Sequence, residues 1–330
     1  MLGSRFASRP SKRTEEHARQ VEQDLAEFKR IVAQSETVLL TDESLWYEGA
    51  AKQKFWTALK ETVESAGIDE IKIFVYLRRQ DELALSYWKQ QVKKVQKTPF
   101  EDFINLRIPS LSLDYRKALA NIESVFGLDA ISVRVYDRDT LIEHDICHDF
   151  CDMMGIEWSE DFQIPEAELN PNLSDTAALV KCWANGLAVY RKMSSNFLCI
   201  PALRYSAKYP SPKASAIMKR ETYDTLRERY ESDNEYVAQQ YLNGEGGKLV
   251  NWPSFDEEDH AQSLDDIPQA IVQMFTEVLT RREQIIKQQS EQLAHLNEFT
   301  LLQQDIIDAQ QAAIDELRSR MDKLESTKRR

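Results

Sequence analysis

Two short apolar runs constrain the fold of this chain more than any other feature. They read IKIFVY at 71–76 and ISVRVY at 131–136, and both are rich in residues that favour strands. The stretch between them is long enough for the helical crossover that two parallel strands require. The runs therefore predict an α/β fold, in which helices cover the faces of a parallel sheet. A third run, TVLL at 37–40, predicts a further strand.

Apolar residues at helical spacing occupy much of the remaining chain up to residue 242. Gly67 and Gly127 are the expected stops of two helices, and Ser174 is the expected N-cap of a third. No convincing strand follows residue 145, so the second half is predicted to be mainly helical. The predicted helices span 13–33, 52–66, 100–106, 114–126, 145–154, 175–192 and 219–242, together with a helix that carries Ser86.

The last part of the chain carries a heptad repeat. Its first position, a, falls on Leu279, Ile286, Leu293, Thr300, Ile307, Ile314 and Met321, and Leu296, Leu317 and Leu324 fall on d. Arg282, Gln289, Gln303 and Gln310 also fall on d, so the apolar seam is imperfect. We expect a coiled coil through which the chain forms a homo-oligomer or binds a partner. A long amphipathic helix folded back on the preceding domain is the alternative.

Composition divides the chain into four parts. A basic tail and a polar helix occupy 1–34, and an α/β domain with a mainly helical second half occupies 35–253. The acidic stretch PSFDEEDHAQSLDDIP predicts a linker at 254–269, which the coiled coil at 270–330 follows.

The bulk charge and the cysteines limit the classes of function. A formal net charge of −13 argues against a general nucleic-acid binder, since phosphate backbones demand clustered Lys and Arg. The four cysteines do not form the dense framework of a small secreted domain, and no N-terminal apolar segment resembles a signal peptide. No apolar run approaches the roughly 20 residues of a bilayer span. We therefore predict a cytoplasmic protein that does not cross a membrane.

An arginine and a serine stand where ligands of parallel α/β sheets collect, beyond the carboxyl ends of the strands. Arg78 follows the strand predicted at 71–76, and Ser86 lies on the helix after that strand. A guanidinium holds a phosphate through two parallel hydrogen bonds, and a helix N-terminus adds a favourable dipole. The alternative is a solvated charge and a tolerated helical serine. Asp81 and Glu82 suit the helix dipole but would repel a dianion.

Several segments, in order, resemble the sulfotransferases, particularly their bacterial carbohydrate-type members. YLRRQDELALSYW is similar to the family segment in which an Arg, seven intervening residues and a Ser bind the 3′-phosphate of the donor. VLLTDESLW, VRVYDRDTLIEHDICHDFCDMMGI, LNPNLSDTAALV and YESDNEYVAQQYL are similar to further family segments. The resemblance covers about residues 35–253. It implies a P-loop-like three-layer fold around a parallel sheet, the co-substrate 3′-phosphoadenosine 5′-phosphosulfate, and donor-binding roles for Arg78 and Ser86.

The family's first strand and its Gly-x-x-Lys-x-Gly-Thr-Thr loop, which cradles the 5′-phosphosulfate, have no counterpart in this sequence. Either the sequence begins downstream of the true start, or this is a member that has lost catalysis. The activity that the resemblance implies is transfer of a sulfuryl group to a hydroxyl of a carbohydrate, without a metal. The alternatives are a non-catalytic scaffold that oligomerises through its coiled coil and, with less support, a kinase or nucleotidase.

The family also has a glutamate at the turn that matches Glu43, which makes Glu43 a candidate catalytic base; an exposed loop acid is the alternative. Tyr136 and Arg138 follow the last predicted strand and are placed to line an acceptor pocket. Lys93, Lys94 and Lys97 form either a basic patch for an anionic ligand or a solvated helix end.

Two further patterns favour ordinary structural roles. His144, Cys147, His148 and Cys151 fall on one helical stripe, where Cys147 and Cys151 are expected to pack as small buried hydrophobes. Zinc accepts such donors, but one straight stripe closes poorly around a tetrahedral ion. NGEGGK at 243–248 lacks the Ser/Thr and the preceding strand of a phosphate loop, so a turn is expected there.

Overall fold

The structure is a computed structural model, and its chain divides into two compact units, residues 1–270 and residues 271–330. The residues that it describes are 15–49, 52–107, 111–159, 161–162, 171–187, 198–211, 217–242, 249–255 and 267–328. The predicted turn at 243–248 therefore lies outside the described residues, as does most of the predicted linker.

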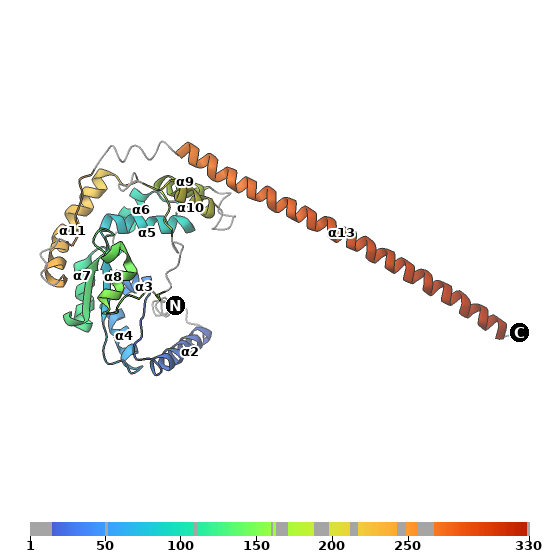
Figure 1. Ribbon diagram of the computed structural model, residues 1–330, viewed down its shortest axis with the longest axis horizontal. Coiled ribbons are helices and arrows are strands. Elements are labelled where there is room, and N and C mark those ends of the chain that lie inside the picture. Colours follow the sequence, from blue (N-terminus) through green and yellow to red (C-terminus); the bar gives the residue numbers. More distant parts are fainter. Residues whose placement is uncertain are drawn as a thin grey trace. The chain divides into compact units, whose positions relative to one another are not determined.

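The first unit carries the predicted strands and most of the helices (Figure 1). Its elements up to the second strand are α2 (Glu15–Val32), α3 (Glu43–Gly49), α4 (Gln53–Glu64), β1 (Ile73–Leu77), α5 (Gln80–Lys94), α6 (Phe100–Arg107), α7 (Tyr115–Phe126), η3 (Leu128–Ala130) and β2 (Ile131–Val135). The later elements of the first unit are η4 (Ile142–His144), α8 (Ile146–Met153), α9 (Asp175–Gly186), α10 (Cys199–Lys208) and α11 (Arg220–Tyr241). The remaining helix, α13 (Ile267–Lys328), begins in the last residues of the first unit and makes up the described part of the second. Within the described ranges, no helix combines the length and apolar character that a bilayer span needs.

The two runs that dominate the sequence form a parallel pair of strands, as predicted. β1 and β2 pair in a register that runs from Ile73 opposite Ile131 to Leu77 opposite Val135. The amide of Tyr136 extends this pairing, since it donates to the carbonyl oxygen of Leu77 at 2.7 Å. Helices α5, α6 and α7 make the crossover between the strands. The fold is therefore mostly helical, with a small parallel sheet of the α/β kind.

The strand predicted at 37–40 is wrong. These residues are described but have no regular structure, and Leu39 and Leu40 are 51% and 40% exposed. A strand is stable only where its backbone groups pair with a neighbour. The run does not pair with β1 or β2, so its apolar character alone does not make it a strand. In the described part of the chain, the sheet has two strands.

The core of the first unit forms where the sheet meets two long helices. Val75 and Leu77 of β1 pack with Leu119 of α7 and Val237 of α11, and all four are buried. In Figure 1, α7 and α11 lie side by side, and they are in contact. Burying an aliphatic side chain of this size stabilises the fold by about 1.5–3 kcal/mol. This packing fixes the strands whose carboxyl ends carry Arg78 and Tyr136.

Buried polar contacts hold α5, the helix that carries Ser86. Gln80 and Asn234 exchange amide hydrogen bonds: Gln80 Nε2 donates to Asn234 Oδ1 at 2.7 Å, and Asn234 Nδ2 donates to Gln80 Oε1 at 3.1 Å. Further along α5, Lys89 Nζ lies 2.6 Å from Asp175 Oδ1 on α9. The side chains of this ion pair are only 10% and 1% exposed. Both ends of α5 are therefore fixed by partners on other helices.

Other boundaries follow the predictions with small shifts. α9 ends at Gly186, six residues before the predicted end, and residues 188–192 lie outside the described part. Ser174 is the N-cap of α9, as predicted, but its hydroxyl makes no capping bond; its amide donates to Ser206 Oγ at 2.8 Å. α13 begins at Ile267, so the last residues of the predicted linker are helical.

Removing one member of the Lys89–Asp175 pair should destabilise the fold strongly. Asp175→Ala leaves a buried ammonium without its carboxylate, and we expect a loss of about 3–5 kcal/mol in the free energy of unfolding, measured by urea denaturation. Replacing both charges together, in Lys89→Met with Asp175→Leu, should cost much less, because no charge is left unpaired. Equal losses in the single and double variants would contradict this account.

Candidate functional site

Arg78 lies just past the carboxyl end of β1, where the sequence places it. Its Nε donates to Glu82 Oε2 at 2.8 Å, and its guanidinium carbon lies 5.6 Å from the centre of the Tyr136 ring. The buried Tyr115 donates its hydroxyl hydrogen to the carbonyl oxygen of Arg78, which fixes the backbone at the end of the strand. The side chain of Arg78 is 32% exposed, so solvent and ligands can reach it.

The carboxylate of Glu82 lies between two guanidiniums. Besides Arg78 it contacts Arg79, whose Nη2 is 3.0 Å from Glu82 Oε1. Arg79 also donates from Nε to Asp81 at 2.6 Å. Burial raises the pKa of Asp81, and the hydrogen bond and charge of Arg79 oppose that rise. Two acids therefore balance two arginines here, and any anion that binds Arg78 competes with Glu82.

Ser86 lies on the same face of α5 as Glu82, because residues four apart on a helix stand one above the other. It is partly exposed, and its hydroxyl has no hydrogen-bond partner in the described part of the chain. Within the same described ranges, the Nη1 and Nη2 groups of Arg78 also make no hydrogen bond, although the guanidinium is paired with Glu82 through Nε. Arg78 thus contacts Glu82, and Ser86 lies one turn further along the face of α5 that carries Glu82. Joint binding by Arg78 and Ser86 stays a prediction.

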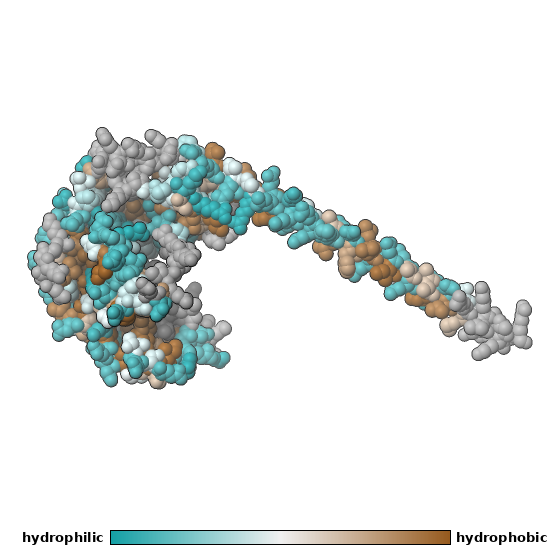
Figure 2. Space-filling model, viewed as in Figure 1, coloured by the Kyte–Doolittle hydropathy of each residue, from teal (hydrophilic) through white to brown (hydrophobic). Residues whose placement is uncertain are grey.

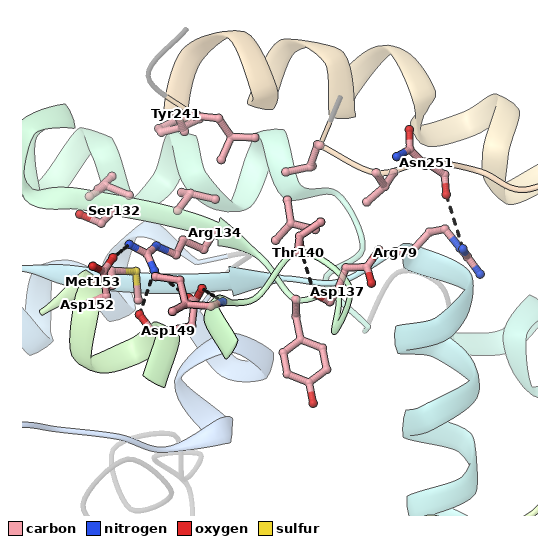
Figure 3. A pocket seen from close by; sticks show the side chains of 18 of the residues that line it. Arg79, Ser132, Arg134, Asp137, Thr140, Asp149, Asp152, Met153, Tyr241 and Asn251 are labelled. Carbon is pink, nitrogen blue, oxygen red and sulfur yellow. Dashed lines mark hydrogen bonds and ion pairs between the residues drawn. The ribbon is translucent and has the colours of Figure 1, made fainter. Parts of the chain in front are cut away.

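A cavity of about 630 Å³ lies beside this face and runs along β2. Figure 3 shows Ser132 and Arg134 of β2 on one side and Tyr241 at the end of α11 on the other. Arg79, Glu82 and Tyr136 line it as well, whereas Arg78 and Ser86 are not among its lining residues. The cavity therefore reaches the neighbours of Arg78. The rule that ligands collect beyond the carboxyl ends of parallel strands indicated a site at that edge of the sheet. It did not predict a cavity along the outer side of β2.

The wall of the cavity contains a polar network that the sequence analysis did not identify. Arg134 Nη1 lies 2.9 Å from Asp149 Oδ1, and its Nη2 lies 2.5 Å from Asp152 Oδ2 (Figure 3). Asp149 is buried and also accepts a hydrogen bond of 2.6 Å from the hydroxyl of Tyr76. Burial favours a higher pKa for Asp149, but the hydrogen bonds from Tyr76, Arg134 and the amide of Ile142 outweigh it and hold the pKa below its usual value. The network fixes α8 to both strands.

Of the other predicted site residues, Tyr136 lies against the Arg78 guanidinium, as described above. Glu43 begins α3, but its side chain lies outside the described residues, so its role as a base stays a prediction. Tyr136 lines the cavity, as expected for a pocket residue, whereas the exposed Arg138 does not. Lys93 donates to the carbonyl oxygen of Pro171 at 2.6 Å, which favours a structural role for that lysine; Lys94 and Lys97 are exposed.

The stripe of histidines and cysteines on and before α8 forms no metal site in the described part of the chain. Cys147 is exposed, so the prediction that it packs as a buried hydrophobe is wrong, and Cys151 is half-buried. The ring of His148 stacks on that of Trp158, with 3.6 Å between the ring centres. This stacking gives the histidine a packing role.

Comparison with known proteins identifies no family for this chain. No family model matches the sequence, and no solved structure matches it. An uncharacterized protein of the archaeon Archaeoglobus fulgidus is 36% identical over 109 residues, which are 33% of this chain and 29% of the archaeal protein. The match thus spans less than a third of either protein.

We expect Asp149→Asn to lower the free energy of unfolding by about 2–3 kcal/mol, because Arg134 then loses its buried charged partner. Asp152→Asn is the matched control, since Asp152 contacts the same guanidinium but is 56% exposed, and it should cost less than about 1 kcal/mol. Denaturation in urea measures both.

The contribution of the Asp149 carboxylate to the free energy of unfolding should also depend on pH. Its folded-state pKa is lowered, so its stabilisation is complete above the unfolded value of about 4 and is lost as the pH falls below it. The difference between the wild-type protein and Asp149→Asn should therefore shrink below about pH 4. A difference that stays constant down to pH 3 would show that the charge of Asp149 is not what stabilises the fold.

Proposed function

We propose that this chain is a sulfotransferase-like protein that binds the adenosine 3′,5′-bisphosphate part of 3′-phosphoadenosine 5′-phosphosulfate at the carboxyl end of β1. One observation carries the proposal: Arg78, just past the end of β1, binds Glu82 on α5 through Nε, and Ser86 lies one helical turn beyond Glu82 on the same face. Within the described ranges, neither the terminal nitrogens of Arg78 nor the Ser86 hydroxyl makes a hydrogen bond. Four N–H groups and one O–H group are therefore available to phosphate oxygens.

The surroundings of Arg78 support phosphate binding. The Tyr136 ring and the Glu82 carboxylate both contact the guanidinium, so its orientation is restricted before a ligand arrives. Such preorganisation reduces the entropy that binding costs. The N-terminus of the 15-residue helix α5 adds a partial positive charge. The neighbouring cavity, at about 630 Å³, falls within the range of about 300–1,000 Å³ that is usual for small-molecule sites, so it can take the rest of a nucleotide.

The proposed chemistry is transfer of a sulfuryl group. The oxygen of a carbohydrate hydroxyl would form a bond to sulfur in line, the bond from sulfur to the bisphosphate oxygen would break, and a base would take the hydroxyl proton. Glu43 is the proposed base. The P-loop-like, three-layer form of the fold belongs to the same proposal. Because the sequence has no Gly-x-x-Lys-x-Gly-Thr-Thr segment, we expect this chain to bind the donor with little or no turnover.

The second candidate function is a non-catalytic scaffold of the same fold. Two observations favour it: the phosphosulfate loop has no counterpart in the sequence, and α13 exposes a row of large apolar side chains. Calorimetric titration with adenosine 3′,5′-bisphosphate separates the two candidates: binding supports the donor-binding protein, and no binding favours the scaffold. Incubation with a sulfate-labelled donor and a panel of glycans then measures turnover, which we expect to be little or none.

Arg78→Ala should abolish most of the affinity for adenosine 3′,5′-bisphosphate in calorimetric titration. A hydrogen bond to a charged group contributes about 1.5–3 kcal/mol, so we expect a loss of about 10- to 100-fold. Ser86→Ala should lose about 3- to 10-fold, because its hydroxyl is neutral. Arg116→Ala is the control, since Arg116 is an exposed arginine on α7 that contacts Asp233. If the unmodified protein does not bind, or if Arg116→Ala loses as much as Arg78→Ala, the proposed donor site is wrong.

Glu82→Gln should strengthen binding of the same nucleotide. The change removes a negative charge that competes with phosphate for Arg78 but keeps an oxygen that accepts the Nε hydrogen bond. At the partly exposed end of a helix, we expect about 3- to 10-fold tighter binding. The gain should fall as salt is added, because salt screens the repulsion. Weaker binding by Glu82→Gln would show that the carboxylate positions Arg78 more than it repels the ligand.

A further inference from the structure

The helix α13 exposes a row of large apolar side chains, which polar residues interrupt at four positions. Positions a and d from Ile286 to Met321 include seven of them, with 45% to 62% of each residue exposed: Ile286, Leu293, Leu296, Ile307, Ile314, Leu317 and Met321. Figure 2 shows hydrophobic atoms along this helix. Exposed apolar surface of this extent marks an interaction site. The period of seven residues is that of a helix which packs on another helix in a coiled coil.

The residue types at a and d favour two strands. Ile286, Ile307 and Ile314 at position a are β-branched, and the apolar residues at d, Leu296 and Leu317, are leucines. β-Branched residues at a with leucine at d favour a parallel dimer over trimers and tetramers. The stretch from Ile286 to Met321 extends for about 53 Å of helix, at about 1.5 Å per residue. It covers more than the three to four heptads that a stable coiled coil usually needs.

The polar residues at d decide the orientation. In an antiparallel pair each d residue faces an a residue of the other helix. The a positions contain one polar residue, Thr300, so at least two of Gln289, Gln303 and Gln310 would face an aliphatic side chain. In a parallel pair in register, each glutamine faces its own copy. A side-chain amide both donates and accepts hydrogen bonds, so two identical glutamines can satisfy each other.

The residues at positions e and g, which flank the seam of a and d residues, are compatible with the parallel arrangement. In a parallel pair each g residue lies near the e residue of the following heptad on the other chain. Four of the five e positions in the seam are uncharged: Ser290, Asn297, Gln304 and Gln311. The fifth, Arg318, lies near Ala313, which is at g in the preceding heptad of the other chain. No like charges therefore meet along the flanks. Arg282 lies at d just before the seam. In a parallel pair it would face the like charge of its own copy, so the seam begins after it.

We propose that residues 286–321 form a parallel, in-register, two-stranded coiled coil with a second copy of this chain. Gln289, Gln303 and Gln310 fix the register, because shifting one helix by a heptad places glutamine against leucine at d. Both copies of the first unit then attach to the same end of the coil. The inference does not depend on nucleotide binding, and its test can fail while the proposed donor site stands.

The test uses the full-length chain at micromolar concentration. Sedimentation equilibrium should give twice the 38.3 kDa of one chain. Ile314→Asn, at position a, should weaken the dimer at least tenfold, whereas Ala312→Asn, on the outer face of the same turn, should leave it unchanged. A monomer mass for the unmodified chain, or a mass of three or four chains, overturns the proposal. So does an equal loss in the two variants.

Cysteine cross-linking tests orientation and register. In a Cys147→Ser background, chosen because Cys147 is exposed, Gln310→Cys places thiols of the two chains opposite each other. A disulfide needs about 4.4–6.8 Å between Cα atoms, which facing seam positions provide. We expect Gln310→Cys to form at least ten times as much reducible dimer as Ser319→Cys, whose thiol is on the outer face of the helix. In the antiparallel register that places Ile286 opposite Leu317, residue 310 lies about 25 Å from its copy along the helix, so an absent cross-link overturns the parallel arrangement.

Discussion

The site depends on the parallel pairing of β1 with β2. Because the strands run in the same direction, their carboxyl ends meet at one edge, and the residues that follow them, Arg78 and Tyr136, come into contact. The hydroxyl of Tyr115 and the amide pair of Gln80 with Asn234 then hold the turn from β1 into α5. An unpaired strand would leave the guanidinium without the ring that restricts it.

The sequence predicted those parts of the fold that depend on local pattern. The two strands and the helices α4 to α9 and α11 follow from apolar period and from glycine stops, whereas α3 and α10 were not predicted. TVLL at 37–40 has the composition of a strand, but pairing is a tertiary property that composition does not contain. The heptad positions of α13 can likewise be read from the local sequence. The orientation of two paired helices cannot, because it depends on which residues of the second copy face the polar residues at d.

The candidate site was predictable in part. The position of Arg78 at a strand end and the spacing to Ser86 are readable from the sequence, and α5 places Ser86 on the face of Glu82. The ion pairs that Glu82 makes with two arginines, and the network of Arg134, Asp149 and Tyr76, join residues from different elements. The one available signal was Arg134, the charged residue in a strand that otherwise consists of Ile, Val and Ser, because a half-buried charge requires a partner.

The central claim is that Arg78 and Ser86 hold a nucleotide phosphate. A crystal structure of the chain with adenosine 3′,5′-bisphosphate tests it most directly. We predict that oxygens of the 3′-phosphate lie within hydrogen-bond distance, about 2.7–3.2 Å, of the Nη groups of Arg78 and of the Ser86 hydroxyl, with Glu82 still bound to Arg78 Nε. A phosphate bound elsewhere, for example to Arg134 in the cavity, or no bound nucleotide at all, would contradict the account.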